Sequence, residues 1–91
     1  MKFTLISARR YYADMSWGGE DYVVLDRKGQ LVGRIILHAQ RPKDRRWLWA
    51  ITAPKQPPSV HNQGYSATRE HAMADFNAQW VALAIGLQYH P

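Results

Sequence analysis

The most informative run of apolar positions lies within residues 46–52, which read RWLWAIT and carry two tryptophans at alternate positions. In an extended strand, successive side chains point to opposite faces, so this alternation places Trp47, Trp49 and Ile51 on one side of a sheet. The residues between them are smaller, and large apolar side chains are usually buried. The pattern therefore predicts a strand whose tryptophan side forms the core.

After residue 67 the apolar positions change to helical spacing. Thr68 is a good N-cap, Glu70 falls in the positive first turn, and Gly86 is a typical C-terminal stop. The helix predicted from Arg69 to Ile85 presents an apolar stripe of the right width to cover one face of a sheet. The stripe consists of Ala72, Met73, Phe76 and Trp80.

A hairpin precedes the tryptophan strand. Residues 21–25 and 31–37 are rich in strand-forming side chains, and residues 26–30 between them supply a glycine-containing turn. Gly33 interrupts the second run, which indicates a bulge or a close approach by another element. Residues 3–7 have the composition of a further short strand.

Together these elements predict an α+β fold. It is a three-stranded antiparallel meander, four-stranded if residues 3–7 join it, packed on one C-terminal helix (β-β-β-α). Residues 1–91 fit a single domain, since domains run from about 50 to 250 residues. The expected divisions are an irregular segment 8–20, the sheet 21–52, a proline-rich loop 53–67 and the helix 68–86.

Composition narrows the class of protein. The chain has no cysteine, which excludes disulfides, thiolate nucleophiles and cysteine-bound zinc and suits a reducing compartment. The first apolar run is too short for a signal peptide, and no stretch approaches the roughly 20 apolar residues of a membrane span. We therefore expect a cytoplasmic protein that contacts no membrane.

Positive charge is concentrated in the predicted sheet and its loops. Residues 1–64 hold 11 basic and 5 acidic side chains, whereas residues 65–91 hold one basic and two acidic ones. A basic surface attracts polyanions, so the leading hypothesis is a non-catalytic module that binds nucleic acid through the sheet and its basic loops. The competing interpretation is a solvated loop that only favours solubility. The expected phosphate contacts are Arg34, Arg41, Lys43, Arg45 and Arg46.

Two alternatives concern the apolar surfaces. If the tryptophan side were open, Trp47 and Trp49 would form a base-stacking platform or a partner-binding surface. The second functional hypothesis is a protein-interaction or homodimerisation module with no nucleic-acid role, because one helix covers only one face of a sheet. Its contacts would be the uncovered face, a free edge strand, or the segment with Tyr11, Tyr12 and Trp17. The apolar residues expected on the uncovered face are Val32, Ile36, Leu48 and Ala50.

No motif for catalysis, metal binding or cofactor binding stands out, so we expect a protein that is no enzyme and has no cofactor. Glu70 and Asp75 are five residues apart on the predicted helix and point in different directions. Gly18 and Gly19 lack the strand–glycine–helix context of a phosphate loop. A small enzyme or ligand-binding domain is the third hypothesis. The histidines, which show no zinc-protease spacing, are His38, His61, His71 and His90.

Three segments together resemble a group of small uncharacterised bacterial proteins. They are residues 32–35 (VGRI), the W-x-W-x-I strand that ends at Ile51, and the G-x-x-A-T-R-E-x-A-M-x-x-F pattern that begins at Gly64. The resemblance spans about residues 21–80, brings no known activity and implies no functional residue. By topology alone, β-β-β-α is similar to integrase arm-binding domains and others that lay a three-stranded sheet on DNA.

Overall fold

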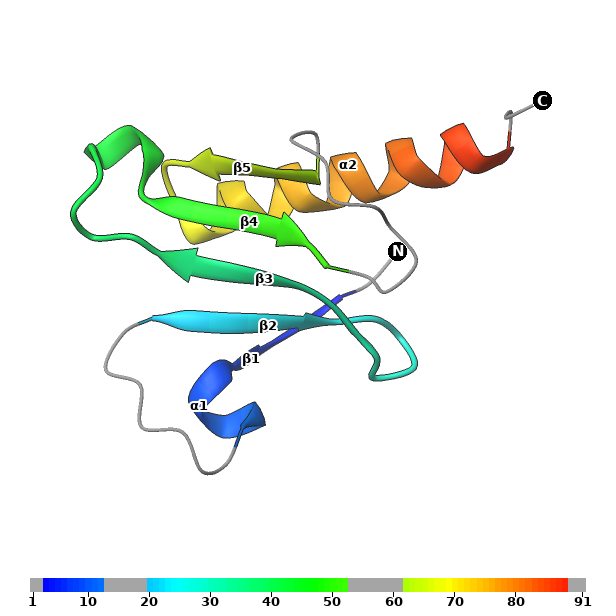
Figure 1. Ribbon diagram of the computed structural model, residues 1–91, viewed down its shortest axis with the longest axis horizontal. Coiled ribbons are helices and arrows are strands. Elements are labelled where there is room, and N and C mark those ends of the chain that lie inside the picture. Colours follow the sequence, from blue (N-terminus) through cyan, green and yellow to red (C-terminus); the bar gives the residue numbers. More distant parts are fainter. Residues whose placement is uncertain (1–2, 13–19, 53–61, 89–91) are drawn as a thin grey trace.

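The computed structural model describes residues 3–12, 20–52 and 62–88. Five strands form one antiparallel sheet in chain order, and a long helix lies across one of its faces (Figure 1). The strands are β1 (Thr4–Ser7), β2 (Asp21–Leu25), β3 (Leu31–Leu37), β4 (Trp47–Ile51) and β5 (Gln63–Ser66). The helices are α1 (Ala8–Tyr11), the single 3-10 turn η1 (Lys43–Arg45) and α2 (Arg69–Gln88).

The α+β class, the antiparallel meander and the C-terminal helix are confirmed, but the sheet has five strands rather than three or four. The N-terminal strand is present as β1, and the fifth strand, β5, lies within the predicted loop 53–67. Residues 53–61 of that loop lie outside the described residues. Beyond its prolines the chain pairs with β4, from Trp47 opposite Ser66 to Ala50 opposite Gln63. The segment has weak strand propensity of its own. It still forms a strand, because its backbone groups form hydrogen bonds with the otherwise unpaired edge of β4.

The helices differ from the sequence prediction in two ways: a short helix, α1, was not predicted, and α2 ends later than predicted. The first residues of the segment 8–20 form α1, and the fully buried Ala8 anchors this turn against β2. Residues 13–19, including Trp17, lie outside the described residues. At the other end, α2 passes Gly86 and ends at Gln88, so the predicted stop is wrong. Glycine inside a helix costs only about 1 kcal/mol relative to alanine, which a long helix tolerates.

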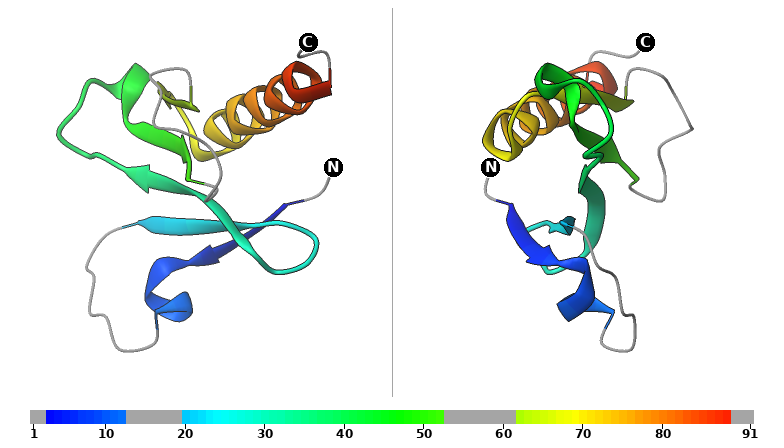
Figure 2. Two further views of the ribbon diagram at one scale, coloured as in Figure 1. Left: turned by 45° about the vertical axis from the view of Figure 1, so that its right-hand side comes forward. Right: turned by 90° about the vertical axis from the view of Figure 1, so that its left-hand side faces the viewer.

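The start of α2 agrees with the prediction. The Thr68 hydroxyl accepts a hydrogen bond from the His71 amide at 3.0 Å, which satisfies one of the unpaired donors of the first turn. Glu70 lies in that first turn, where a negative charge is favourable. The helix then packs mainly on β4 and β5 and also touches β3. Figure 2 shows α2 over this half of the twisted sheet, while α1 lies at the other end beside β1.

The tryptophan side of β4 is the inside of the protein, as predicted. Phe76 is fully buried between α2 and the sheet, where Trp49 has only 9% of its surface exposed. The ring of Phe3 packs edge-on against Phe76 and Trp80, with centroids 5.4 and 5.5 Å apart. The first described residue therefore contacts the C-terminal helix. The buried members of this core are Val24, Val32, Ile35, Trp49, Ile51, Ala72 and Phe76.

Two glycines allow large rings to lie close to the sheet. A Cβ at Gly33 would come within 2.2 Å of Cε2 of Phe76, and a Cβ at Gly64 would lie 2.9 Å from the indole of Trp49. Gly33 also lies opposite Val24 at a shift in the β2–β3 register. The interruption predicted at Gly33 is therefore both a bulge and a close approach of another element.

A second, smaller core lies on the face of the sheet that points away from α2, here named the outer face. It forms beside α1, at the β1–β2 end of the sheet. The β2–β3 pairing skips Val32, whose side chain joins the α2 side, so its predicted place on the outer face is wrong. The buried members of the second core are Ala8, Val23 and Leu25, with Ile6, Tyr12 and Leu31 packed around them.

Candidate nucleic-acid interface

The β3–β4 connection carries four of the five predicted phosphate contacts, and its backbone is closed by its own hydrogen bonds. The His38 amide donates to the Arg46 carbonyl at 2.7 Å, and the Arg41 amide donates to the His38 carbonyl at 3.0 Å. Within η1, the Arg45 amide donates to the Pro42 carbonyl at 2.9 Å. A loop with its backbone groups paired in this way holds its cations in a defined arrangement.

Two of the arginine side chains also help to hold the loop. Arg46 Nε donates to the Arg41 carbonyl at 2.8 Å, and Arg41 Nε donates to the Arg45 carbonyl at 3.2 Å. The Arg41 guanidinium carbon lies 3.8 Å from the centroid of the Tyr65 ring, in a cation–π contact with β5. Each of the two Nε hydrogen bonds uses only one of the five N–H donors of its guanidinium. Arg41 and Arg46 therefore combine a structural role with a fixed positive charge.

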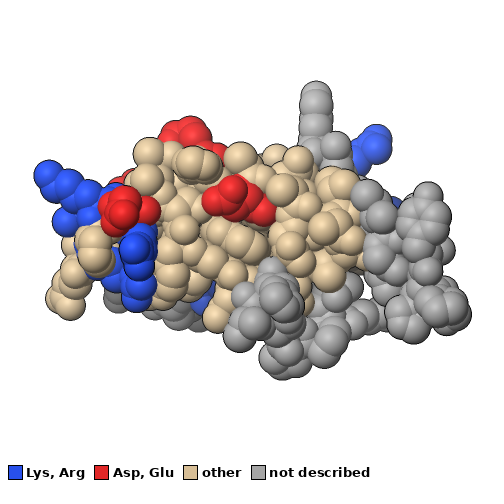
Figure 3. Space-filling view, turned by 90° about the horizontal axis from the view of Figure 1, so that it is seen from above, with Lys and Arg blue, Asp and Glu red and all other residues tan. Residues whose placement is uncertain are grey.

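The remaining two cations of the loop, Lys43 and Arg45, are exposed on η1. The loop has one acidic residue, Asp44, whose carboxylate lies 3.9 Å from Arg45 Nε. Both side chains of this pair are mostly exposed, and such pairs are weak in water. The loop therefore keeps a positive balance, and Figure 3 shows Lys and Arg gathered at the end of the molecule that carries it.

Arg34 lies apart from the loop. Its place on the outer face of β3 agrees with the expected register, because it pairs with Ala50 rather than with a tryptophan. There its guanidinium forms an ion pair with Asp21 of β2, whose side chain is only 12% exposed. A carboxylate this close neutralises much of the charge that Arg34 would offer to a phosphate. The structure brings four of the predicted contacts together and leaves Arg34 in the sheet.

Sequence reasoning missed two aromatic side chains next to the loop. Tyr65 is 38% exposed on the outer face, and the His38 ring meets it edge-on with centroids 5.7 Å apart. No signal in the sequence indicated this, because Tyr65 comes to lie opposite Leu48 only through the pairing of β5 with β4. Beside these rings, residues 36–41 line a hollow of about 470 Å³.

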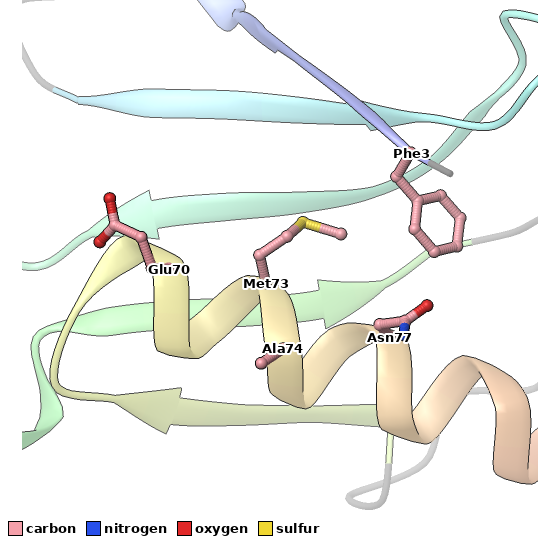
Figure 4. Close-up of a pocket in the computed structure, with 5 residues that line it drawn as sticks. All are labelled: Phe3, Glu70, Met73, Ala74 and Asn77. Carbon is pink, nitrogen blue, oxygen red and sulfur yellow. The ribbon is translucent and has the colours of Figure 1, made fainter. Parts of the chain in front are cut away.

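A second hollow, of about 290 Å³, lies between the start of β1 and α2. Figure 4 shows Glu70 toward one end, Phe3 and Asn77 toward the other, and Met73 between them. The Oδ1 atom of Asn77 is buried and has no hydrogen-bond partner. One carboxylate and one amide beside apolar side chains provide neither a nucleophile with its base nor a set of metal ligands.

The other acidic and histidine side chains do not converge. Asp75 accepts a hydrogen bond from the Ser66 hydroxyl at 2.6 Å, whereas Glu70 lies 3.7 Å from Arg69, so the two carboxylates diverge as predicted. Among the described residues, no group of three or more His, Asp or Glu side chains could hold a metal ion. His61 and His90 lie outside the described residues.

Comparison with known proteins adds no family assignment. The chain matches no family model, no curated protein and no solved structure. The resemblance to small bacterial proteins therefore stays a prediction. Within the described ranges, no helix is both long enough and apolar enough to cross a membrane.

Proposed function

We propose that this protein is a small, non-catalytic module that binds nucleic acid through the phosphate backbone at its β3–β4 loop. The observation that carries the proposal is the concentration of four cations on one hydrogen-bonded loop with a single acid. The outward side of α2 offers no comparable charge, since Arg69 is the only basic residue after position 64. The loop is therefore the best-placed surface for a polyanion.

The fixed arginines favour binding for a physical reason. An unrestrained arginine side chain loses rotamer freedom when it contacts a phosphate, which offsets part of the attraction. Arg41 and Arg46 are already held by hydrogen bonds to loop carbonyls, so less freedom is lost. Four phosphate contacts predict that log K falls against log salt with a slope of about −3.6 for a duplex or about −2.8 for a single strand.

Replacing both exposed cations, Lys43→Met with Arg45→Met, is expected to halve this slope, because two of four phosphate contacts are lost. Fluorescence anisotropy with labelled oligonucleotides between about 50 and 200 mM salt measures the slope. The matched control is Arg27→Met with Lys28→Met, which removes the same charge from the exposed β2–β3 turn.

Two results would contradict the proposal. The first is absence of binding to any oligonucleotide at about 50 mM salt, where phosphate contacts are strong. The second is an equal flattening of the slope in the control variant, which would show that net charge rather than the β3–β4 loop determines binding.

A second candidate function is a protein-interaction or homodimerisation module, and the outward face of α2 favours it. After Asp75 the helix contains no charged residue. Its exposed side chains there include Ala78, Val81 and Ala82, and Val81 is 41% exposed. Surface helices normally present charged and polar side chains to water, and an uncharged face is typical of one that a second chain covers.

Self-association through this face predicts a dimer that Val81→Glu weakens at least about tenfold, because a carboxylate would be buried at the contact. Static light scattering over a concentration series measures the mass. His71→Glu is the matched control, since it adds the same charge at an exposed position in the first turn of α2. A wild-type protein that stays strictly monomeric at high concentration excludes the homodimer.

A further inference from the structure

We propose that the β3–β4 loop takes single-stranded nucleic acid, with one unpaired base stacked on the guanidinium of Arg41 in the hollow beside the loop. This inference rests on the proposed function and names its class of substrate. Its basis is the place of Arg41, which lines the hollow and lies over the Tyr65 ring. Arg41 thus belongs to the basic loop and also contacts an aromatic ring of the outer face.

The Arg41 guanidinium is held as a planar surface. Its carbon lies 3.8 Å from the centroid of Tyr65, and its Nε donates to the Arg45 carbonyl. The ring supports one side of the guanidinium, and the hydrogen bond fixes its rotation. Unpaired bases stack on aromatic rings and on arginine planes alike, because every base has a π-face. A guanidinium positioned in advance loses little freedom when a base stacks on it.

The hollow has the size and composition that one base requires. Its volume of about 470 Å³ lies within the range of small-ligand sites. Its lining includes the apolar residues Ile36 and Ala39 and two residues that can form hydrogen bonds, His38 and Gln40. A base can therefore stack on Arg41, and its polar edge can pair with groups on the same loop.

The arrangement of the site favours single-stranded nucleic acid over a duplex. In a duplex the base faces are already stacked on their neighbours, so only an unpaired base can use this hollow. Reading a duplex groove usually requires a cationic helix or a strand pair that enters it. The basic turn η1 has three residues, and α2 carries no basic residue after Arg69. Lys43 and Arg45 are exposed on η1 of the same loop, so they are available to contact the phosphates of the bound strand.

The test compares two strands on the wild-type protein. One is a thymidine oligonucleotide, and the other is an abasic strand of the same length, which has the same phosphates and no bases. Loss of one stacked base is expected to weaken binding of the abasic strand roughly 5- to 150-fold. A duplex of matched sequence is expected to bind through phosphates alone, with the steeper salt dependence of a duplex and without the contribution of a stacked base.

Variants then locate the contact. Arg41→Lys keeps the positive charge and removes the plane, so it should lower affinity for the thymidine strand by a larger factor than affinity for the abasic strand. Tyr65→Leu should act in the same direction. Tyr11→Leu is the matched control, because Tyr11 is 40% exposed and lies on α1, away from the loop.

The outcomes separate the two proposals. Equal affinity for the thymidine and abasic strands overturns the stacked base, while the phosphate-binding module stands. Absence of binding to every strand and to the duplex overturns both. Because the strand comparison uses the unaltered protein, a variant that fails to fold does not affect the result.

Discussion

Gly33→Ala is expected to destabilise the protein by about 3 kcal/mol or more, because the added methyl group has no space. Its Cβ would lie 2.2 Å from Cε2 of Phe76 and 2.4 Å from the carbonyl oxygen of Ala50. The Phe76 ring is fully buried and cannot move into water, and the oxygen belongs to the β4 backbone. Urea unfolding followed by tryptophan fluorescence measures the change.

Gly29→Ala is the control for this substitution. Nothing lies within 4 Å of a Cβ there, but the positive φ of 79° disfavours alanine by about 1 kcal/mol. Equal losses at Gly29 and Gly33 would contradict a steric cause. Adding Phe76→Leu to the Gly33→Ala protein should recover only part of the loss, because the Ala50 oxygen remains in place.

Phe76→Ala is expected to cost about 3–5 kcal/mol, since it leaves a cavity where α2 meets the sheet. The ring contacts Phe3 edge-on and stacks on Trp80 with centroids 6.3 Å apart, so its removal weakens both contacts. The same unfolding experiment measures the loss. A single domain is usually stable by about 5–15 kcal/mol, so this variant approaches the limit of folding.

Val81→Ala on the same helix is the comparison for Phe76→Ala. The Val81 side chain is 41% exposed, so its truncation is expected to change stability by less than about 0.5 kcal/mol. A Phe76→Ala protein that unfolds at the same urea concentration as Val81→Ala would show that Phe76 is not the centre of the core.

The elements with strong periodicity could be predicted from the sequence. Alternation placed Trp47 and Trp49 on one face of a strand, and helical spacing placed Phe76 on the face of α2 that covers it. The close approach of another element at Gly33 could also be predicted, because a glycine inside a strand pattern leaves space for a neighbouring side chain. These features are local, so each depends on residues that are near in sequence.

The fifth strand could not be predicted for a physical reason. Its four residues, Gln63–Ser66, include a glycine and have little strand propensity of their own. They form a strand because β4 offers an unpaired edge and because Gly64 leaves room for the Trp49 indole. Both conditions are tertiary. The four residues of α1 are likewise stabilised by burial of Ala8 rather than by helix propensity.

The run of basic residues identified the β3–β4 loop, but the sequence could not show which side chains on neighbouring strands contact its arginines or Arg34. The ion pair of Arg34 with Asp21 joins residues that lie diagonally on β2 and β3, and the bulge changes the register from which such a pair would be inferred. The contact of Arg41 with Tyr65 required β5, which the sequence did not indicate. The site was therefore predicted as a set of charges without its aromatic residues.

The contact of Phe3 with Phe76 and Trp80 determines when folding can finish during synthesis. A meander forms from neighbouring strands, so β1 to β4 can pair soon after they leave the ribosome. The partners of Phe3 are made more than 70 residues later, when α2 is translated. Until then the side of the sheet that carries Trp49 lacks the helix that packs on it, and the nascent sheet exposes apolar surface to chaperones and to other chains.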